Sequence, residues 1–331
     1  MPDRSEVDTP AVELQAPDIG RWREGHTGVD WVHQFDSGQP GPTVMVQALT
    51  HGNEICGAIA LDGLLQQMLA DDGPRWRPRI GRLILAFGNV EAYVRFDPAD
   101  PFASRLVDED YNRVWDDAAL LGDRDSAELR RARLLRPFVD DADFLLDIHS
   151  MSSPCVPLMV CGTVDKNAAF ARRLGMPEVL LLDTGHAAGL RMVERGGFGD
   201  SASPKHALLI ECGQHWERAA ADVAGDSMVR FLGLTGVAES DWVAANVRLP
   251  LPPVQRLVRV TEAVVALSPN LRFLVPTLGL SVVQKAGTPI AQDGDTVWTA
   301  PYDDTVLVMP GTRNLKAGGT AVRLGRFESA G

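Results

Sequence analysis

A histidine and a carboxylate stand three positions apart in the segment His51-Gly52-Asn53-Glu54. Where a strand gives way to a helix, side chains at this spacing can both reach one metal ion. Imidazole nitrogen and carboxylate oxygen are ordinary ligands of zinc, and a catalytic zinc site needs three protein ligands with a fourth position left for water. The pair therefore predicts a zinc site. The alternative is a loop histidine beside a glutamate that is favoured only by the dipole of the following helix.

Two further polar residues stand at the ends of apolar segments downstream. Residues 144–150 are typical of a buried strand that ends on His149, and residues 207–210 are typical of one that ends at Glu211. Two histidines, one metal-binding glutamate and one free glutamate make up a hydrolase site. Asp147 lies on the same side of its strand as His149, because side chains alternate along a strand. It could orient the imidazole as an outer acceptor, and a purely structural carboxylate is equally consistent with its position.

The segments around these residues alternate between strand and helix patterns. Residues 55–69 keep an apolar stripe at helical spacing, and residues 126–138 do the same behind Ser126, which suits an N-cap. Short apolar runs, typical of strands covered on both faces, occupy residues 43–49, 82–87, 143–148, 155–161 and 206–211. This order predicts an α/β fold with a mostly parallel mixed sheet and helices on both faces.

The polar residues fall at the ends of these predicted strands. His51 follows the first strand, Asn89 the second, His149 closes the third and Glu211 closes the last. Ligands of open α/β sheets bind beyond the carboxyl ends of the strands. The pattern therefore predicts that these side chains share one edge of the sheet.

The composition changes near Pro250, where residues 249–253 read as a proline-rich linker. Beyond it, β-branched stretches such as 258–265, 280–283 and 305–308 are separated by Gly, Pro, Asp and Asn, and no long helical stripe appears. We expect two domains, a catalytic α/β domain over residues 1–249 and a small β domain over residues 250–331.

Charge and cysteine content narrow the class of protein. Among 331 residues, 44 Asp and Glu outnumber 32 Lys and Arg, and a net charge of -12 disfavours nucleic acid and anionic membranes as partners. No leader-like segment or apolar stretch of roughly 20 residues appears, so we expect a cytoplasmic location. No CxxC spacing occurs, and we expect free thiols rather than a thiolate metal site at Cys56, Cys155, Cys161 and Cys212.

Four motifs together resemble a known family. Residues 50–54, 105–113, 147–150 and 210–213 occur in the order and spacing of the succinylglutamate desuccinylase/aspartoacylase family, a branch of the zinc carboxypeptidase-like enzymes. The resemblance covers roughly residues 40 to 245 and is weaker in the carboxyl-terminal region. In the resembling family, the added β domain covers part of the cleft.

The resemblance implies roles for individual residues. His51, Glu54 and His149 are similar to the family's zinc ligands, with one zinc per chain, and Glu211 resembles its general base. Zinc lowers the pKa of a bound water to near 7, so a nearby carboxylate can share the water's proton. A charged strand end facing solvent is the alternative for Glu211.

The second motif implies residues that bind substrate. Asn112 and Arg113 are similar to the family's clamp for a substrate carboxylate, and arginine suits this because its guanidinium makes two parallel hydrogen bonds. Arg105 stands where the family polarises the amide carbonyl. Surface ion pairs are the alternative for these arginines. Asp110 could anchor one of them or be an ordinary loop residue.

Other positions are less informative. Ser201 stands where aspartoacylases place another carboxylate-binding arginine, which predicts an acyl or side-chain pocket that is less demanding of a second negative charge. Residues 185–203 could form a substrate loop or merely a connection. His186, His206 and His215 have no ligand spacing with the four motifs, and we interpret them as structural or solvent-exposed, least securely for His215.

These observations predict a zinc amidohydrolase that removes an acyl group from the nitrogen of an amino acid or a related small carboxylate. Its partner would be a small amide substrate that carries a carboxylate, and a homo-oligomer is left open. A zinc carboxypeptidase would need an open groove for a peptide. A zinc-binding regulatory protein without turnover would not need Glu211.

Overall fold

The computed structural model describes residues 10–69, 75–183, 189–311, 313 and 315–328, and it is built around one long mixed sheet. In spatial order the eleven strands of this sheet are β1 (Val32–Asp36), β3 (Arg82–Phe87), β2 (Thr43–Ala48), β4 (Phe144–Met151), β7 (His206–Gln214), β5 (Leu158–Val160), β6 (Val179–Leu182), β8 (Arg256–Val265), β14 (Thr320–Phe327), β13 (Thr305–Val308) and β10 (Val282–Val283).

The centre of the sheet is parallel, as the sequence predicts. β3, β2, β4 and β7 run in one direction, with Val44 opposite Leu83 on one side and Phe144 on the other. All six residues of β2 are buried, which explains why its sequence is an apolar run rather than an alternating one. β1 is an antiparallel edge strand and β5 is antiparallel to β7. The sequence predictions missed β1 and β6.

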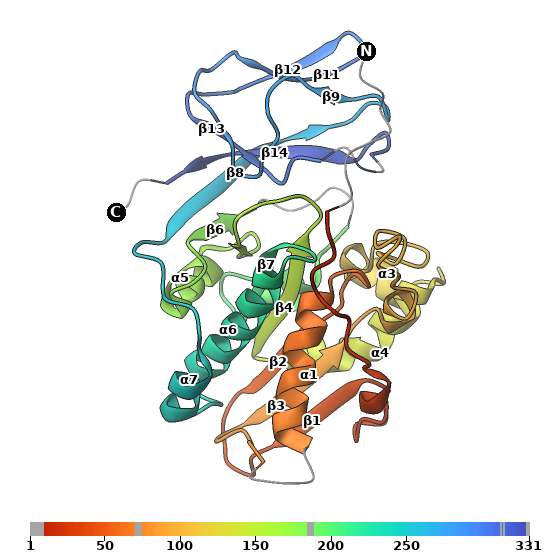
Figure 1. Cartoon of the computed structure of the whole chain (residues 1–331), viewed down its shortest axis with the longest axis vertical. Helices are drawn as coiled ribbons and strands as arrows, with labels where there is room; N and C mark the ends of the chain where they lie inside the picture. Colours follow the sequence, from red (N-terminus) through yellow and green to blue (C-terminus); the bar gives the residue numbers. More distant parts are fainter. Residues whose placement is uncertain (1–9, 70–74, 184–188, 312, 314, 329–331) are drawn as a thin grey trace.

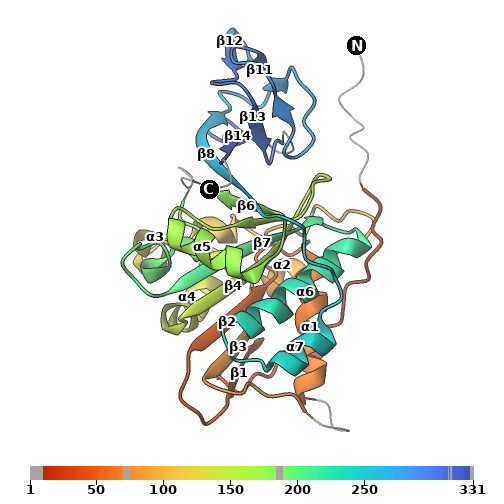
Figure 2. The ribbon, with the colours of Figure 1, turned by 90° about the vertical axis from the view of Figure 1, so that its left-hand side faces the viewer.

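Helices cover both faces of this sheet, which confirms the predicted architecture. Figure 2 shows α1 and α6 on one side of the central strands and α4 on the other. Helix α4 begins after Ser126, whose hydroxyl accepts a hydrogen bond from the Leu129 amide at 3.0 Å. The helices are α1 (Ile55–Leu69), α2 (Val90–Tyr93), α3 (Asp117–Leu121), α4 (Ala127–Asp141), α5 (Asp165–Leu174), α6 (Arg218–Leu234) and α7 (Ser240–Asn246).

The carboxyl-terminal strands continue the same sheet. β8 pairs in parallel with β6, and β14, β13 and β10 follow by antiparallel pairing (Figure 1). A separate three-stranded sheet packs above them and shares an apolar core with β8, β10, β13 and β14. Its strands, in spatial order, are β12 (Thr296–Thr299), β11 (Pro289–Asp293) and β9 (Arg272–Phe273). The division into two domains at residue 250 stays a prediction, because the large sheet runs across that point.

Two smaller expectations can be compared with the structure. The four cysteines are free, and all but the half-buried Cys155 are buried. Over the part of the chain that the structure describes, no helix has the length and apolarity needed to cross a bilayer.

Candidate active site

His51 and Glu54 lie in the turn that joins β2 to α1. Leu49, just after the strand, has a φ of +62°, and the chain then folds back so that α1 begins at Ile55. A Cβ atom at Gly52 would stand 2.4 Å from the Ser104 carbonyl oxygen, so only glycine lets this turn pack so closely. Both side chains that could ligate a metal are thereby buried at the carboxyl end of β2.

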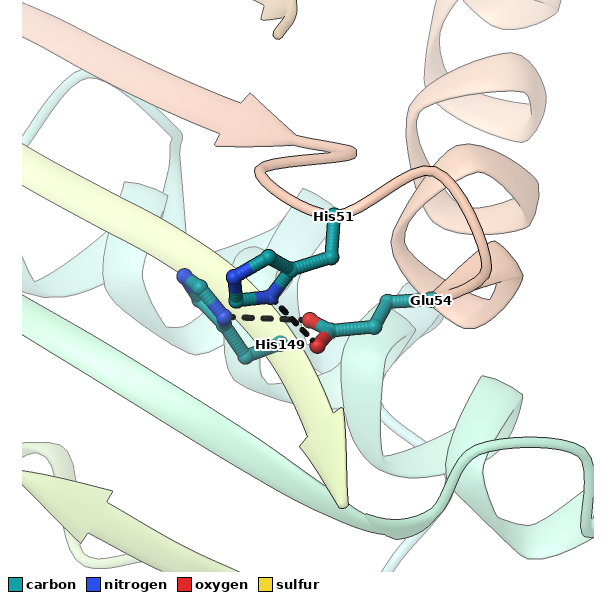
Figure 3. Close-up of side chains that lie close together, drawn as sticks. All are labelled: His51, Glu54 and His149. Atoms are coloured by element: carbon teal, nitrogen blue, oxygen red, sulfur yellow. Dashed lines mark hydrogen bonds and ion pairs between the residues drawn. The ribbon is translucent and has the colours of Figure 1, made fainter. Parts of the chain in front are cut away.

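His149 completes a compact three-residue cluster. One ligand atom each from His51, Glu54 and His149 lies within 4.8 Å of the others. Figure 3 shows the Glu54 carboxylate facing both rings, with Oε1 2.6 Å from His51 Nδ1 and Oε2 3.0 Å from His149 Nδ1. Two buried imidazoles that converge on one carboxylate fit the donor set of a catalytic zinc site. We call these three residues the metal cluster.

Each imidazole of the metal cluster has a carboxylate behind it. His149 Nε2 lies 2.7 Å from Asp147 Oδ2, and His51 Nε2 lies 3.0 Å from Asp110 Oδ1. This arrangement fixes which ring nitrogen faces a metal. The outer-acceptor alternative for Asp147 therefore has the required geometry. Asp110 has a second role that the sequence did not indicate, since it reaches His51 as well as Arg105, at 3.4 Å.

The charges within the metal cluster perturb one another. Burial would raise the pKa of Glu54, but the facing His51 and His149 rings hold it well below its ordinary value. Burial would lower the pKa of His149, and the carboxylates of Asp147 and Glu54 instead raise it well above its ordinary value. The cluster therefore strongly favours a positive charge at its centre, which is what a bound cation supplies.

Glu211 faces the same cavity from β7, where it is paired in register with His149. Glu211 is half-buried as a residue, and burial, with a smaller contribution from Glu54, raises its pKa to about 8 against the opposing effect of His149. Its Oε2 atom has no hydrogen-bond partner among the residues that the structure describes. The side chain therefore lines the pocket with one enclosed oxygen, and its role as general base stays a prediction.

The pocket has a volume of about 220 Å³ and brings the predicted site residues together. Those that line it are His51, Glu54, Arg105, Asn112, Arg113, His149 and Glu211. The opposite rim comes from the carboxyl-terminal region, through Gly279 and residues 309–311. Residues from both sides of the predicted domain division thus enclose one cavity.

One stretch of the chain contributes three pocket residues, which are Arg105, Asn112 and Arg113. Asp110 begins the short 3-10 helix η2 (Tyr111–Arg113) by accepting a hydrogen bond from the Asn112 amide at 2.9 Å. Arg105 Nη1 is 3.4 Å from Glu54 Oε1, so its guanidinium borders the metal cluster. Asn112 Oδ1 accepts from the Met192 amide at 3.1 Å, so part of this amide side chain supports the fold.

Two further arginines in the pocket escaped the sequence analysis. Arg191 is buried and its Nη1 is 2.9 Å from Asp183 Oδ2, while its Nη2 pairs with Glu194. Arg323, from β14, places its Nε 2.9 Å from the same Asp183 oxygen. Burial lowers the pKa of Arg323 to about 10, and the nearby Arg191 and Arg113 contribute to this shift against Asp183.

We call Arg113, Arg191 and Arg323 the arginine cluster. One signal could have revealed part of it, because Asp183 directly follows β6 and so ends a strand as His149 and Glu211 do. Ser201 is exposed and does not line the pocket. Of the predicted loop at 185–203, residues 185–188 lie outside the described residues, and the remainder contributes Arg191.

The remaining histidines differ from one another. His206 stacks on Phe170 with ring centroids 4.7 Å apart, which confirms a structural role. His186 lies outside the described residues. His215 is buried and lines the pocket. The sequence analysis, which interpreted it as structural or solvent-exposed, therefore missed a pocket residue. Burial lowers the pKa of His215 to about 3, which keeps its ring neutral.

Comparison with known proteins identifies the family of this chain. The model of the succinylglutamate desuccinylase/aspartoacylase catalytic domain matches residues 40–224, more than half of the chain. The chain belongs to this family. No match was found among curated proteins. Membership supports a hydrolase of the deacylase type.

Solved structures share the fold over nearly the whole chain. Succinylglutamate desuccinylase from Vibrio parahaemolyticus is 16% identical to this chain. The match covers 91% of this chain and 87% of the desuccinylase chain, with a TM-score of 0.66. The succinylglutamate desuccinylase/aspartoacylase from Rhodobacter sphaeroides is also 16% identical, with coverage of 90% and 89% and a TM-score of 0.61. The ectoine utilization protein EutE from Ruegeria pomeroyi, solved with bound product, is 16% identical. The match covers 92% of this chain and 92% of EutE, with a TM-score of 0.58.

Proposed function

We propose that this family member is a zinc-dependent amidohydrolase that releases an acyl group from the nitrogen of a small, carboxylate-bearing amide. The observation that carries the proposal is the meeting of the metal cluster, Glu211 and Arg113 in one enclosed pocket. A metal-binding cluster alone would serve many functions. A carboxylate that lines the same pocket but lies outside the three-residue cluster, together with a guanidinium, is what hydrolysis of an acidic amide requires.

His51, Glu54 and His149 would hold one zinc ion per chain. Zinc bound there would supply a Lewis acid for the acyl carbonyl and would acidify a water molecule. Glu211 takes a proton from the attacking water at its carboxylate and delivers it to the leaving nitrogen. Arg105 borders Glu54 and stabilises the negative charge that develops on the carbonyl oxygen.

The substrate carboxylate would bind to Arg113 and the Asn112 amide. Two features favour a small substrate over a peptide: the pocket volume of about 220 Å³ and the carboxyl-terminal residues on its opposite rim. On this proposal residues 1–249 form the catalytic domain, and residues 250–331 form the small β domain that flanks the cleft. A carboxypeptidase is the second candidate because it would use the same zinc, glutamate and arginine.

The test is metal analysis followed by mass-spectrometric screening of the zinc-loaded protein against N-acetyl and N-succinyl amino acids, with a chelated control. We expect release of acyl groups that depends on zinc. Faster cleavage of peptides with a free carboxyl terminus would favour the carboxypeptidase. Stable zinc binding with no turnover of either substrate class would favour a regulatory protein.

A further inference from the structure

His215 is held rigidly at the edge of the pocket, directly after β7. Its backbone amide donates to the Met151 carbonyl at 2.9 Å, and its ring packs beside Trp216, with centroids 5.4 Å apart. Trp216 is itself fixed by a 3.0 Å hydrogen bond from its Nε1 to the Asn53 carbonyl. Only 1% of the surface of His215 is exposed, so its ring has little freedom to reorient.

The two ring nitrogens of His215 have different surroundings. Nδ1 lies 2.8 Å from the Ser150 hydroxyl oxygen. Nε2 is buried and has no hydrogen-bond partner among the residues that the structure describes. Leaving a buried polar group unpaired costs about 1 to 3 kcal/mol, so native proteins rarely do so unless a ligand or water completes it. The residue lines the pocket.

The Ser150 hydroxyl selects the tautomer of this ring. A hydroxyl has one proton to donate, and the only side-chain hydrogen bond recorded for Ser150 within the described chain is to His215. When the hydroxyl donates to Nδ1, the proton of the neutral imidazole resides on Nε2. The opposite arrangement would leave the hydroxyl proton without an acceptor. The arrangement with the fewest unpaired groups therefore puts the ring proton on Nε2.

The position of His215 relative to the metal cluster decides which part of a bound substrate its ring could contact. Its ring nitrogens are outside the three-residue metal cluster. Ser150, which holds its Nδ1, donates its own backbone N–H to Glu54 Oε2 at 3.3 Å, whereas Arg105 borders Glu54 Oε1. His215 thus contacts Ser150, whose backbone contacts Glu54, and it lines the same pocket as Arg105.

We propose that the Nε2–H of His215 donates a hydrogen bond to the acyl carbonyl oxygen of the substrate and, with Arg105, stabilises the negative charge that develops there. This inference rests on the proposed amide hydrolysis. Ser150 acts through His215 and is a positioning residue. A neutral N–H donor that is fixed in advance suits this task, because it needs no rearrangement during the reaction.

The first experiment compares kcat and KM of zinc-loaded variants on the best acyl amino acid. We expect His215→Leu to lower kcat by roughly 10²-fold, the usual effect of losing one oxyanion donor, with zinc content unchanged. His215→Gln can place an amide N–H near the Nε2 position and should recover part of the loss. His206→Leu is the matched control, since His206 is a stacked histidine outside the pocket.

Three results of this experiment, two kinetic and one from metal analysis, would overturn the proposal. They are an unchanged kcat in His215→Leu, a loss of zinc from that variant, and a glutamine variant no better than the leucine variant. The loss of zinc would mean that His215 only supports the metal cluster. An unchanged kcat would mean that Nε2 is merely an unpaired atom of the fold.

A second experiment does not depend on turnover. Long-range ¹H–¹⁵N spectra of the zinc-loaded protein with labelled histidine report which ring nitrogen carries the proton, and His215→Gln identifies the signal. We expect the Nε2–H tautomer in the parent and mixed tautomers in Ser150→Ala. Acetate, as a probe with carbonyl-type oxygens, should shift the Nε2 signal.

These spectra separate the two hypotheses. If the parent hydrolyses no acyl amino acid, the proposed function fails, and the spectra still decide whether Nε2 of His215 carries the proton and meets a carbonyl-type oxygen. An Nδ1–H tautomer, or an Nε2 signal that saturating acetate leaves unmoved, would overturn the proposal whatever the kinetics show.

Discussion

The metal cluster and the arginine cluster face the same pocket but are supported in different ways. In the metal cluster each imidazole has its own carboxylate, Asp147 behind His149 and Asp110 beside His51. In the arginine cluster Arg191 and Arg323 share one oxygen of Asp183.

This difference in support has a consequence for single substitutions. Each imidazole of the metal cluster pairs with one outer carboxylate of its own, so the loss of either member of such a pair should be felt in full. A guanidinium of the arginine cluster has two others nearby, so the loss of one positive charge is partly compensated. We therefore expect effects on metal binding and turnover to be larger than effects on recognition of substrate charge.

The largest effect should follow removal of a metal ligand. We expect His51→Ala or His149→Ala to lose the metal and to reduce activity by roughly 10³-fold or more, because several kcal/mol of charge stabilisation disappear and each 1.4 kcal/mol is tenfold in rate. Metal content per chain and turnover are the measurements. His26→Ala, at an exposed histidine, is the control. A double variant that retained its full zinc would rule out these ligands.

Removal of the proposed base should come next. We expect Glu211→Gln to retain zinc and to lose about 10²-fold or more in kcat, because an amide cannot accept the proton of the attacking water. The exposed strand residue Glu262 offers a matched control as Glu262→Gln. Undiminished hydrolysis in the Glu211 variant would assign this carboxyl to structure and would require another base.

A smaller effect is expected from the outer carboxylate of His149. Asp147→Asn keeps the shape of the side chain but weakens the hold on the imidazole at Nε2, which typically costs 10- to 100-fold in metal affinity. Zinc affinity measured by competition with a chelator tests this, with Asp36→Asn at a strand end as the control. An unchanged affinity would contradict an orienting role and leave Asp147 as a structural carboxylate.

The two clusters also differ in how far the sequence predicts them. His51, His149 and Glu211 each lie at or just beyond a strand that reads as an apolar run, so local pattern alone places them at one edge of the sheet. Arg323 reaches the pocket only because β14 pairs with β8, more than 50 residues away in sequence, and no local spacing encodes that pairing.

The missed elements have the same kind of explanation. β6 has only four residues, too few for its pattern to stand out, so Asp183 at its end went unnoticed. β1 mixes polar and apolar residues because it is an edge strand. His215 was dismissed because it lacks ligand spacing, whereas its importance comes from an unpaired nitrogen that only the packed structure reveals.

The smallest effect, and the sharpest comparison between the clusters, concerns Arg113. We expect the parent to prefer an acyl amino acid over its carboxamide, and Arg113→Met to reduce that preference about tenfold. A charge-assisted hydrogen bond contributes roughly 1.5 to 3 kcal/mol, and the lower end applies here because Arg191 and Arg323 remain close to the lost charge. The measurement is the ratio of kcat/KM for the two substrates, with Arg82→Met, at a partly exposed ion pair, as the control. Equal processing of both substrates by the parent, or an unchanged ratio in Arg113→Met, would contradict the carboxylate clamp. A collapse well beyond tenfold would instead show that the neighbouring arginines do not compensate, because Asp183 and Glu194 already neutralise them.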